Sequence, residues 1–529
     1  MMQTDALVKD LSDTGESSAQ SSGVESAREG FVINVSSNVA FMVVQAVVSF
    51  WFTPYLIRHL GIAVYGMIPL VNSVTAYLQI FTSGFNSAVN RFLTIDLERG
   101  DRLTANKTFN TALFGVVGVV LVLSPVALAL SWAFPYIFDV PSGWESDTRW
   151  LFAFVAVVFF ISVIGSNFAV SSYAYSKFLL RNGVNLAALF ARVGLVVALF
   201  SLFPARLTHV GGGFLISAIV FYLSHRLIWR KLTPELRVQI TAFDRSRLRP
   251  LMGMGGWVAV NRVGGMLLKR VDLIVVNTVF GAAMTGGYGS VLQFSALTES
   301  LGTSAGGVLV PIIFRKYAQG DFIGLKRLAS QAVKLLGLAL ALPVGLLCGF
   351  SRPLLSIWLG PSFEDLSVLL VFLVAHLSLN LCVLPLLYVQ SAYNRIRWPG
   401  IVTLLSGGAN LGLAILLATW GGCGVVGVAL AGAIVWTAKN AMYTPIYTAQ
   451  VMRLPWWTFL PKLSASVIGT FLVGAAAYGL TLARMPNSWL TLASSAAVVS
   501  LLYALSVGVI GLNRTDWQLL KDLFPWRTK

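Results

Sequence analysis

The chain has 529 residues, of which 56% are hydrophobic and 11% are charged, and its formal net charge at pH 7 is +17. Because soluble globular proteins carry about 25% charged residues, this composition excludes a fold built mainly from soluble domains. Nucleic-acid binding does not explain the basic excess, since the sequence has no module of interleaved basic and aromatic residues. We attribute the excess to the cytoplasmic loops of a membrane protein.

Residues 1–30 differ from the rest of the chain. They are rich in Ser and carry six acidic residues against Lys9 and Arg28, with almost no apolar run. This composition predicts a disordered tail. The tail lacks the basic start and apolar centre of a cleaved signal peptide, so we expect the first membrane segment to be retained as an anchor.

The rest of the chain is dominated by long apolar runs. A helix needs about 20 apolar residues to cross the hydrocarbon core of a bilayer. About fourteen runs satisfy this requirement, near 31–57, 62–88, 109–134, 150–176, 183–203, 210–230, 250–281, 284–312, 333–351, 367–392, 398–420, 424–448, 461–482 and 489–511. We therefore expect an all-α polytopic membrane protein with about 14 transmembrane helices.

The distribution of Lys and Arg predicts the orientation of these helices. With the N-terminus inside, most of the 38 basic residues fall in the tails and the even-numbered loops. Cytoplasmic loops are the ones that retain an excess of Lys and Arg. We expect a multi-pass protein of the cytoplasmic (inner) membrane with both termini in the cytoplasm.

One pattern of short motifs occurs twice. A Tyr-Gly pair opens an apolar segment, an Arg stands where apolar character gives way to charge, and a Gly-Asp pair follows. The two copies are Tyr65-Gly66, Arg91 and Gly100-Asp101, and then Tyr288-Gly289, Arg315 and Gly320-Asp321. The matched order and spacing indicate an internal repeat, which is typical of transporters.

The repeat predicts the domain organisation. Both Tyr-Gly pairs open a segment, six crossings apart, so the two copies run in the same direction and form a parallel repeat of two six-helix lobes. Two extra helices follow at the C-terminal end. The expected parts are a cytoplasmic tail (1–30), an N-lobe (31–230), a basic cytoplasmic linker (231–249), a C-lobe (250–448), and helices 13 and 14 with a cytoplasmic C-terminal tail (449–529).

Two stretches carry a family resemblance. The run from Phe52 to Gly61, followed by Val64-Tyr65-Gly66, resembles the opening of polysaccharide-exporting flippases. The run from Val271 to Asn277, with Gly281 and Tyr288-Gly289, resembles the start of their second lobe. These flippases belong to the multidrug/oligosaccharidyl-lipid/polysaccharide exporter superfamily, whose members have twelve to fourteen helices in two lobes.

The resemblance implies a function. Such a protein moves an undecaprenyl-pyrophosphate-linked oligosaccharide from the inner to the outer leaflet for assembly of a surface polysaccharide or exopolysaccharide. Its partners are then the polyprenyl-linked oligosaccharide and membrane lipid, with other polysaccharide assembly proteins as further candidates. We expect alternating access of the two lobes around a basic central cavity.

Cations within the apolar segments are the candidate substrate ligands. Segment seven carries Arg262, Lys269 and Arg270 beside Asp272. A cation at the centre of a membrane helix costs about 2.5–3.5 kcal/mol on insertion scales and usually faces a bundle interior or a watery cavity. A pyrophosphate would balance the positive excess of this segment. The alternative is a structural ion pair between Arg270 and Asp272.

Further cations interrupt other apolar segments. Arg192 in segment five and Lys439 in segment twelve are expected partners in the same substrate path, although partial snorkelling toward the inner surface would also explain them. Arg91 and Arg315 lie at cytoplasmic helix ends, where they anchor the topology or form a gating contact.

Two acidic residues lie deep in the segments. Glu299 and Asp272 are candidates for ion coupling, because a buried carboxylate can carry a proton or bind Na⁺. Glu299 could instead form a salt bridge with Lys269 or Arg262. We predict no cofactor other than coupling H⁺ or Na⁺ and no metal site, and the absence of a phosphate-binding Gly-rich loop argues against direct use of ATP.

Three other functions remain open. A proton- or sodium-coupled multidrug exporter of the same superfamily would favour acidic, aromatic pockets, whereas the inner residues here are mainly basic. A lipid II flippase would bind a similar head group. A membrane polysaccharide polymerase would need positioned carboxylates or a large catalytic loop, so we expect the protein not to be an enzyme.

Overall fold

The computed structural model describes residues 36–80, 93, 96, 99–175, 177–246 and 260–523. Within these ranges every regular element is helical. Eleven of the described helices are long and apolar enough to cross a membrane. The expected all-α architecture is therefore confirmed, whereas the total of fourteen membrane helices stays a prediction. The N-terminal tail and Arg91 lie outside the described residues.

In chain order the described elements are Ser36–Leu60, α2 (Ile62–Ala76), α4 (Arg102–Ile137), α5 (Glu145–Ala174), α6 (Phe178–Leu202), α7 (Leu207–Leu232), η1 (Ile240–Ala242), a helical stretch at 260–269, α9 (Val271–Gly307), α10 (Val310–Ala318), α11 (Phe322–Gly349), α12 (Ser351–Leu359), η2 (Pro361–Phe363), α13 (Leu366–Val374), α14 (Leu377–Cys382), α15 (Leu384–Ala392), α16 (Arg397–Thr419), α17 (Gly424–Thr437), η3 (Ala438–Tyr443), α18 (Thr444–Val451), α19 (Leu460–Ala483), α20 (Trp489–Ser506), η4 (Val507–Gly511) and α21 (Arg514–Leu523).

Two of the membrane spans are interrupted. The Leu366–Ala392 span is divided into α13, α14 and α15, and the Gly424–Val451 span contains the π-helix η3 between α17 and α18. A π-helical turn inside an α-helix is often found at a functional site, because it leaves the regular hydrogen-bond pattern locally broken. Polar contacts described below lie at both interruptions.

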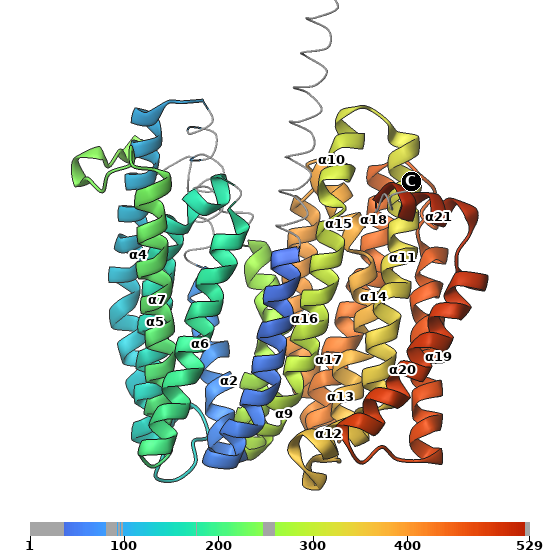
Figure 1. Cartoon of the computed structure of the whole chain (residues 1–529), viewed down its shortest axis with the longest axis horizontal. Helices are drawn as coiled ribbons and strands as arrows, with labels where there is room; N and C mark the ends of the chain where they lie inside the picture. The colour runs from blue at the N-terminus through green and yellow to red at the C-terminus, as the bar shows by residue number, and fades with distance from the viewer. Residues whose placement is uncertain are drawn as a thin grey trace, which may run out of the picture. The chain divides into compact units, whose positions relative to one another are not determined.

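The described residues form two compact units. Unit 1 comprises those within 1–52, 85–127 and 153–253, and unit 2 those within 53–84, 128–152 and 254–529. In unit 1, the rings of Phe109, Phe168 and Trp229 join α4, α5 and α7, with centroids 5.2 to 5.8 Å apart. In unit 2, α11 packs along α19, and α19 lies beside α20, at the red end of the chain in Figure 1.

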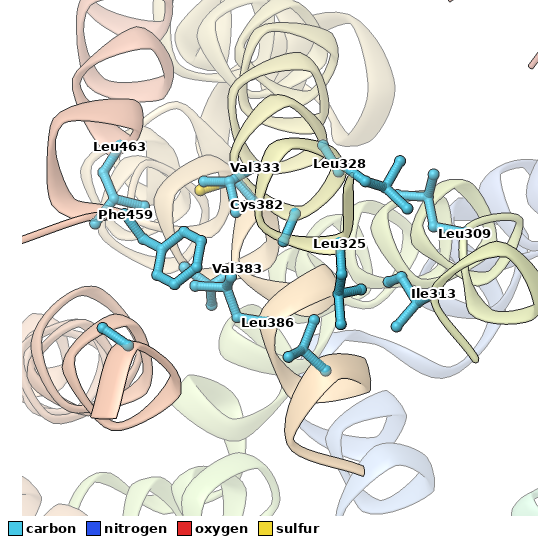
Figure 2. Close-up of a cluster of buried hydrophobic side chains, with 14 residues drawn as sticks. Leu309, Ile313, Leu325, Leu328, Val333, Cys382, Val383, Leu386, Phe459 and Leu463 are labelled. Atoms are coloured by element: carbon cyan, nitrogen blue, oxygen red, sulfur yellow. The ribbon is translucent and has the colours of Figure 1, made fainter. Parts of the chain in front are cut away.

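Unit 2 has a core of aliphatic side chains. Figure 2 shows Leu325 and Val333 of α11 among side chains from α10, α14, α15 and α19. Phe459 and Cys382 are fully buried in this cluster. Apolar packing therefore holds together four membrane spans: the continuous spans Phe322–Gly349 and Leu460–Ala483 and the interrupted spans Leu366–Ala392 and Gly424–Val451.

The repeated Gly-Asp pair is a helix start. Gly100 and Gly320 have φ values of 71° and 70°, a left-handed conformation that glycine adopts at little cost. The next residue caps the following helix: Asp101 Oδ1 accepts from Thr104 N at 3.0 Å, and Asp321 Oδ1 accepts from Gly324 N at 2.8 Å. Caps rather than hydrophobicity fix the start of a helix, so α11 begins well before the apolar run expected at 333.

Lys316 supports the second of these caps. Its Nζ donates to Asp321 Oδ2 at 2.7 Å, and this hydrogen bond lowers the pKa of the Asp321 carboxyl below its ordinary value. The capping side chain is therefore kept in the ionised form, which accepts the backbone hydrogen bond more strongly.

Glycine also makes two abrupt connections between membrane helices. Gly61 joins the Ser36–Leu60 helix to α2 with φ 79° and ψ 159°. Gly281 divides α9 into two limbs with φ 83° and ψ −178°. Residues with a Cβ essentially never adopt this combination of angles. The turn at Gly281 is further held by Asp139, whose Oδ2 accepts from Ala282 N at 2.7 Å.

The Tyr-Gly segments of the repeat pack against each other within unit 2. A Cβ added at Gly66 would lie 2.6 Å from Gly286 N, and one at Gly289 would lie 2.6 Å from Pro69 Cγ. Helices that approach this closely are held by van der Waals contact between backbones, which requires small residues at the crossing. The contact between α2 and α9 therefore depends on the glycines that define the repeat.

We expect the substitution Gly281→Ala to destabilise the protein. The alanine would have to hold a backbone conformation that costs about 1–3 kcal/mol, and its Cβ would lie 2.8 Å from Asp139 Oδ2. The measurement is the thermal unfolding midpoint of the purified protein in detergent. Gly307→Ala is the matched control, because a Cβ at Gly307 meets nothing within 4 Å. Equal midpoints for the two variants would contradict the role assigned to the turn.

Candidate functional site

Side-chain contacts join the second limb of α9 to its first limb and to the helical stretch at 260–269. Lys269 Nζ forms an ion pair with Glu299 Oε2, across 30 residues of sequence. Tyr288 OH donates to Asp272 Oδ2 at 2.8 Å. The reversal at Gly281 therefore brings together residues that are far apart in sequence. Of the two alternatives for Glu299, the structure shows the salt bridge with Lys269.

Lys269 also contacts an aromatic ring. Its Nζ lies 4.5 Å from the centroid of the Trp436 ring on α17, a distance that allows a cation–π interaction. Trp436 in turn lies 5.6 Å, between ring centroids, from His376. The Lys269 and Glu299 side chains remain 40% and 24% exposed, so the ion pair stays accessible to a ligand.

A chain of neutral polar groups continues from His376 to a second lysine. Asn380 Nδ2 donates to His376 Nδ1 at 2.8 Å and lies 3.1 Å from Thr437 Oγ1. The Asn380 carbonyl oxygen accepts from Asn440 Nδ2 at 3.0 Å. Asn440 Oδ1 accepts from Lys439 Nζ at 3.3 Å. The network thus crosses between the two interrupted spans and ends on a cation.

We call Lys269, Glu299, Trp436 and Lys439 the lysine cluster. Lys439 and Trp436 are three residues apart and so project from a similar side of the helix. Lys439 lies within the π-helix η3, and its hydrogen-bond acceptor is a neutral amide. Among the described residues, Glu299 is the carboxylate that pairs with a lysine of this cluster. The cluster therefore carries one more positive than negative charge.

A second polar group, the carboxylate site, consists of Asp272, Tyr288 and Asn410. Asp272 is 6% exposed. Its Oδ1 lies 3.4 Å from Asn410 Nδ2, which is also 3.4 Å from the carbonyl oxygens of Leu267 and Leu268. Asn410 Oδ1 is buried without a hydrogen-bond partner. The expected alternative, an ion pair of Asp272 with Arg270, does not occur among the described residues.

Three other cations predicted from the sequence do not belong to the lysine cluster or to the carboxylate site. Arg262, Arg270 and Arg315 are exposed. Arg315 lies in the last turn of α10, where a positive charge interacts favourably with the helix dipole. A role for Arg262 and Arg270 in substrate contact stays a prediction.

Arg192 lies in unit 1. Its guanidinium carbon is 5.2 Å from the centroid of the Phe214 ring, and its Nε is buried without a hydrogen-bond partner. Arg192 also lines a cavity of about 480 Å³ between the Ser36–Leu60 helix, α5, α6 and α7. A role for Arg192 in the substrate path stays a prediction.

Sequence reasoning missed several contributors to these groups. Trp436 fits an apolar pattern, Asn410 is a single amide within the apolar run at 398–420, and the sequence marks Tyr288 only as part of the repeat. The available signal was weak: Trp436 precedes Lys439 by one helical turn in a span with few other polar residues. His376 and Asn380 lie one turn apart in the sequence, but their link to Lys439 depends on a contact between two spans.

Comparisons with known proteins agree with this architecture. The chain is 28% identical over 494 residues to the "Uncharacterized membrane protein EpsK" of Bacillus subtilis (strain 168), covering 93% of this chain and 98% of the relative. It is 21% identical over 350 residues to the "Putative O-antigen transporter" of Shigella flexneri, covering 64% of this chain and 79% of the relative.

Solved structures show the same fold. The structure of the lipid II flippase MurJ in an inward closed conformation matches with a TM-score of 0.60 at 13% identity, covering 90% of this chain and 98% of that one. An inward-facing multidrug resistance MATE family transporter of the MOP superfamily matches with a TM-score of 0.59 at 14% identity, covering 85% and 99%.

The family model described as "Polysaccharide biosynthesis protein" matches residues 31–316, more than half of the chain. Together with the helical architecture and the relatives above, this match identifies the chain as a multi-pass membrane protein that belongs to the polysaccharide biosynthesis protein family.

Proposed function

We propose that this protein is a flippase that moves an undecaprenyl-pyrophosphate-linked oligosaccharide across the cytoplasmic membrane for assembly of a surface polysaccharide or exopolysaccharide. The observation that carries the proposal is the lysine cluster, which holds two cations and one carboxylate, with Lys439 in the Gly424–Val451 membrane span. A relative is named as a putative O-antigen transporter, and a protein of the same fold as a lipid II flippase. Both names agree with a lipid-linked saccharide as substrate.

The charge of the lysine cluster favours an anionic ligand. A cation in a membrane span is costly unless it faces a partner or a watery cavity. Lys269 has Glu299, whereas the hydrogen-bond acceptor of Lys439 among the described residues is the neutral Asn440 amide. A pyrophosphate would supply the missing negative charge to Lys439. Arg262 and Arg270, on the segment that carries Lys269, are proposed as further contacts for the same head group.

The neutral part of the network suits a saccharide. Trp436 and His376 offer flat rings, and Asn380 and Asn440 offer amide groups of both polarities. Specific binding sites commonly combine aromatic walls with a few placed polar groups. The head group and the first sugar would thus contact adjoining parts of one network, while the polyprenyl chain remains in lipid.

The carboxylate site is proposed to couple transport to an ion gradient. Asp272 is buried, and its partners are a hydroxyl and an amide rather than a cation. Asn410 Oδ1 and the nearby carbonyl oxygens add hard oxygen atoms to the site. A proton on the carboxylate, or Na⁺ bound by these oxygens, would neutralise it. Glu299 is the second proposed coupling residue, through release of Lys269.

Transport is proposed to follow alternating access. The interruptions at α13–α15 and at η3 provide positions where a span can change its angle, as hinges in transporters do. Within the lysine cluster, Lys269 contacts Trp436 of the Gly424–Val451 span, and Asn380 of the Leu366–Ala392 span hydrogen-bonds Thr437, which lies in the same span as Trp436. A bound head group would therefore act directly on the segments that move.

The likeness to a multidrug transporter supports a second candidate, a cation-coupled drug exporter. Such a protein would use the Trp436 ring to bind a drug cation, but Lys269 already lies over that ring. The deciding experiment is depletion of the protein in cells followed by analysis of lipid-linked glycans. Accumulation of undecaprenyl-linked repeat units on the cytoplasmic leaflet supports the flippase. Unchanged glycans with increased sensitivity to cationic drugs would replace it with the exporter.

We expect Lys439→Gln to reduce export of the polysaccharide about ten- to a hundredfold, because hydrogen bonds to charged groups are worth about 1.5–3 kcal/mol. Lys439→Arg should retain a larger part of the activity. The measurement is surface polysaccharide per amount of membrane-inserted protein. Lys462→Gln on α19 is the control, since Lys462 is exposed and outside the cluster. Full export by the Lys439→Gln variant would remove this residue from the site.

Simultaneous neutralisation of Arg262, Lys269 and Arg270 by glutamine should abolish export while leaving membrane insertion intact. The physical reason is the loss of three positive charges from the segment proposed to meet the pyrophosphate. The same triple variant with Glu299→Gln added tests whether the loss of export results from the Glu299 carboxylate, which would otherwise remain without Lys269. Normal export by the triple variant would show that the head group binds elsewhere.

Asp272→Asn should uncouple transport from the ion gradient, because the amide keeps a similar shape but cannot take up a proton or neutralise Na⁺. The measurement is the rate of lipid-linked glycan transfer in proteoliposomes, with and without an imposed pH or Na⁺ gradient. The wild type is expected to respond to one gradient, and the variant to neither. Asp365→Asn, at an exposed position, is the control. An unchanged gradient response in the Asp272 variant would exclude this residue from coupling.

A further inference from the structure

Unit 1 contains a cavity that the lysine cluster does not account for. Its volume is about 480 Å³, and four helices of the same unit line it: Ser36–Leu60, α5, α6 and α7. Small-molecule sites have volumes of about 300–1,000 Å³. The cavity is therefore large enough to take one or two sugar residues.

The walls of the cavity combine amides, hydroxyls and aromatic rings. Gln45 comes from the first helix, Asn185 from α6, Ser162 from α5 and Ser217 from α7. Phe214 supplies an apolar face. These groups can donate to and accept from sugar hydroxyls while a ring covers the apolar side of the sugar, which is the composition expected of a specific polar-ligand site.

The helix faces that form the cavity are fixed by neighbouring contacts. Asn182 Nδ2 donates to Ser37 Oγ at 2.8 Å and to Asn38 Oδ1 at 2.7 Å, which ties α6 to the first helix. Asn182 and Asn185 lie three residues apart, and Arg192 lies seven residues after Asn185, so all three share one face of α6. The polar face of α6 is thus held against the first helix at one end and open to the cavity further along.

Arg192 is the charged group of this cavity. Its Nε is buried without a hydrogen-bond partner, and its neighbour on one side is the Phe214 ring. No carboxylate pairs with Arg192 in the part of the chain that the structure describes. A cation beside a cavity and without a carboxylate partner is costly, so an anionic group of a ligand in the cavity would supply the missing counter-charge.

We propose that this cavity binds a sugar residue that carries a carboxylate, as part of the transported glycan. The proposal rests on the flippase function and adds a substrate class to it. A single guanidinium surrounded by neutral donors matches one carboxylate, whereas the more highly charged pyrophosphate matches the two lysines of unit 2. Arg192, expected from the sequence to meet the head group, is thereby assigned to the saccharide.

The test compares two lipid-linked probes in proteoliposomes: a polyprenyl-pyrophosphate disaccharide that ends in glucuronate and one that ends in glucose. Arg192→Gln should lower the transfer rate of the glucuronate probe about tenfold, as expected for loss of one charge-assisted hydrogen bond, and change that of the glucose probe less than about twofold. Arg181→Gln, an exposed position on the same helix, should leave both rates unchanged.

Equal loss for both probes in the Arg192 variant would assign the residue to the pyrophosphate or to folding, and no loss would exclude it from the substrate path. Either result overturns the proposal. If the wild type transfers neither probe, the depletion experiment decides the flippase function, and equilibrium binding to the purified protein decides the cavity alone. Preference for methyl glucuronide over methyl glucoside that disappears in Arg192→Gln supports the site, and equal binding of the two compounds by the wild type refutes it.

Discussion

The reversal of α9 at Gly281 is the constraint on which the polar part of unit 2 depends. It turns the second limb back along the first limb and along the preceding stretch at 260–269, so that Asp272 meets Tyr288 and Lys269 meets Glu299. Membrane helices lack a hydrophobic drive toward one another, so packing and interhelical hydrogen bonds must hold such limbs together. The glycine conformation at the turn and the bond from Ala282 N to Asp139 Oδ2 determine where these partners stand.

Much of the architecture could be predicted because it depends on local properties of the sequence. The apolar runs predicted helices, the repeat pointed to the glycines of the α2–α9 contact, and the resemblance predicted the family that the comparisons identify. The site was harder to predict, since spacing along one helix reveals only its own face. Asn410 contacts Asp272 from α16, and no pattern within either segment predicts that contact.

Because spacing along one helix reveals only that helix's own face, the sequence left the partners of Glu299 and Asp272 open. Glu299 pairs with Lys269, one of the alternatives that charge alone suggested. Asp272 does not pair with Arg270, although the two are close in sequence, because residues two apart point to different sides of a helix. Its carboxylate instead faces Tyr288 on the returning limb. Closeness in sequence therefore did not predict the partner of Asp272, because that partner lies on the returning limb of α9.

The two units also present different electrostatic environments. In unit 2, cations, a carboxylate and an indole ring lie along a network that crosses two interrupted spans. In unit 1, the Arg192 guanidinium lines a cavity with amides and hydroxyls, and no carboxylate pairs with it among the described residues.

The π-helix at Ala438–Tyr443 has a consequence for the phase of its span. A π-turn holds one residue more than an α-turn, and each residue of an α-helix advances by about 100°, so the residues on its two sides are offset by that angle. Thr437 before the turn reaches Asn380, while Thr448 after it hydrogen-bonds Gln390 at 2.8 Å. Deleting a single residue here would restore regular winding and rotate one of these threonines off its partner. The extra residue of the π-helix thus sets the rotation of the helix after it relative to the helix before it, so that both threonines face their partners.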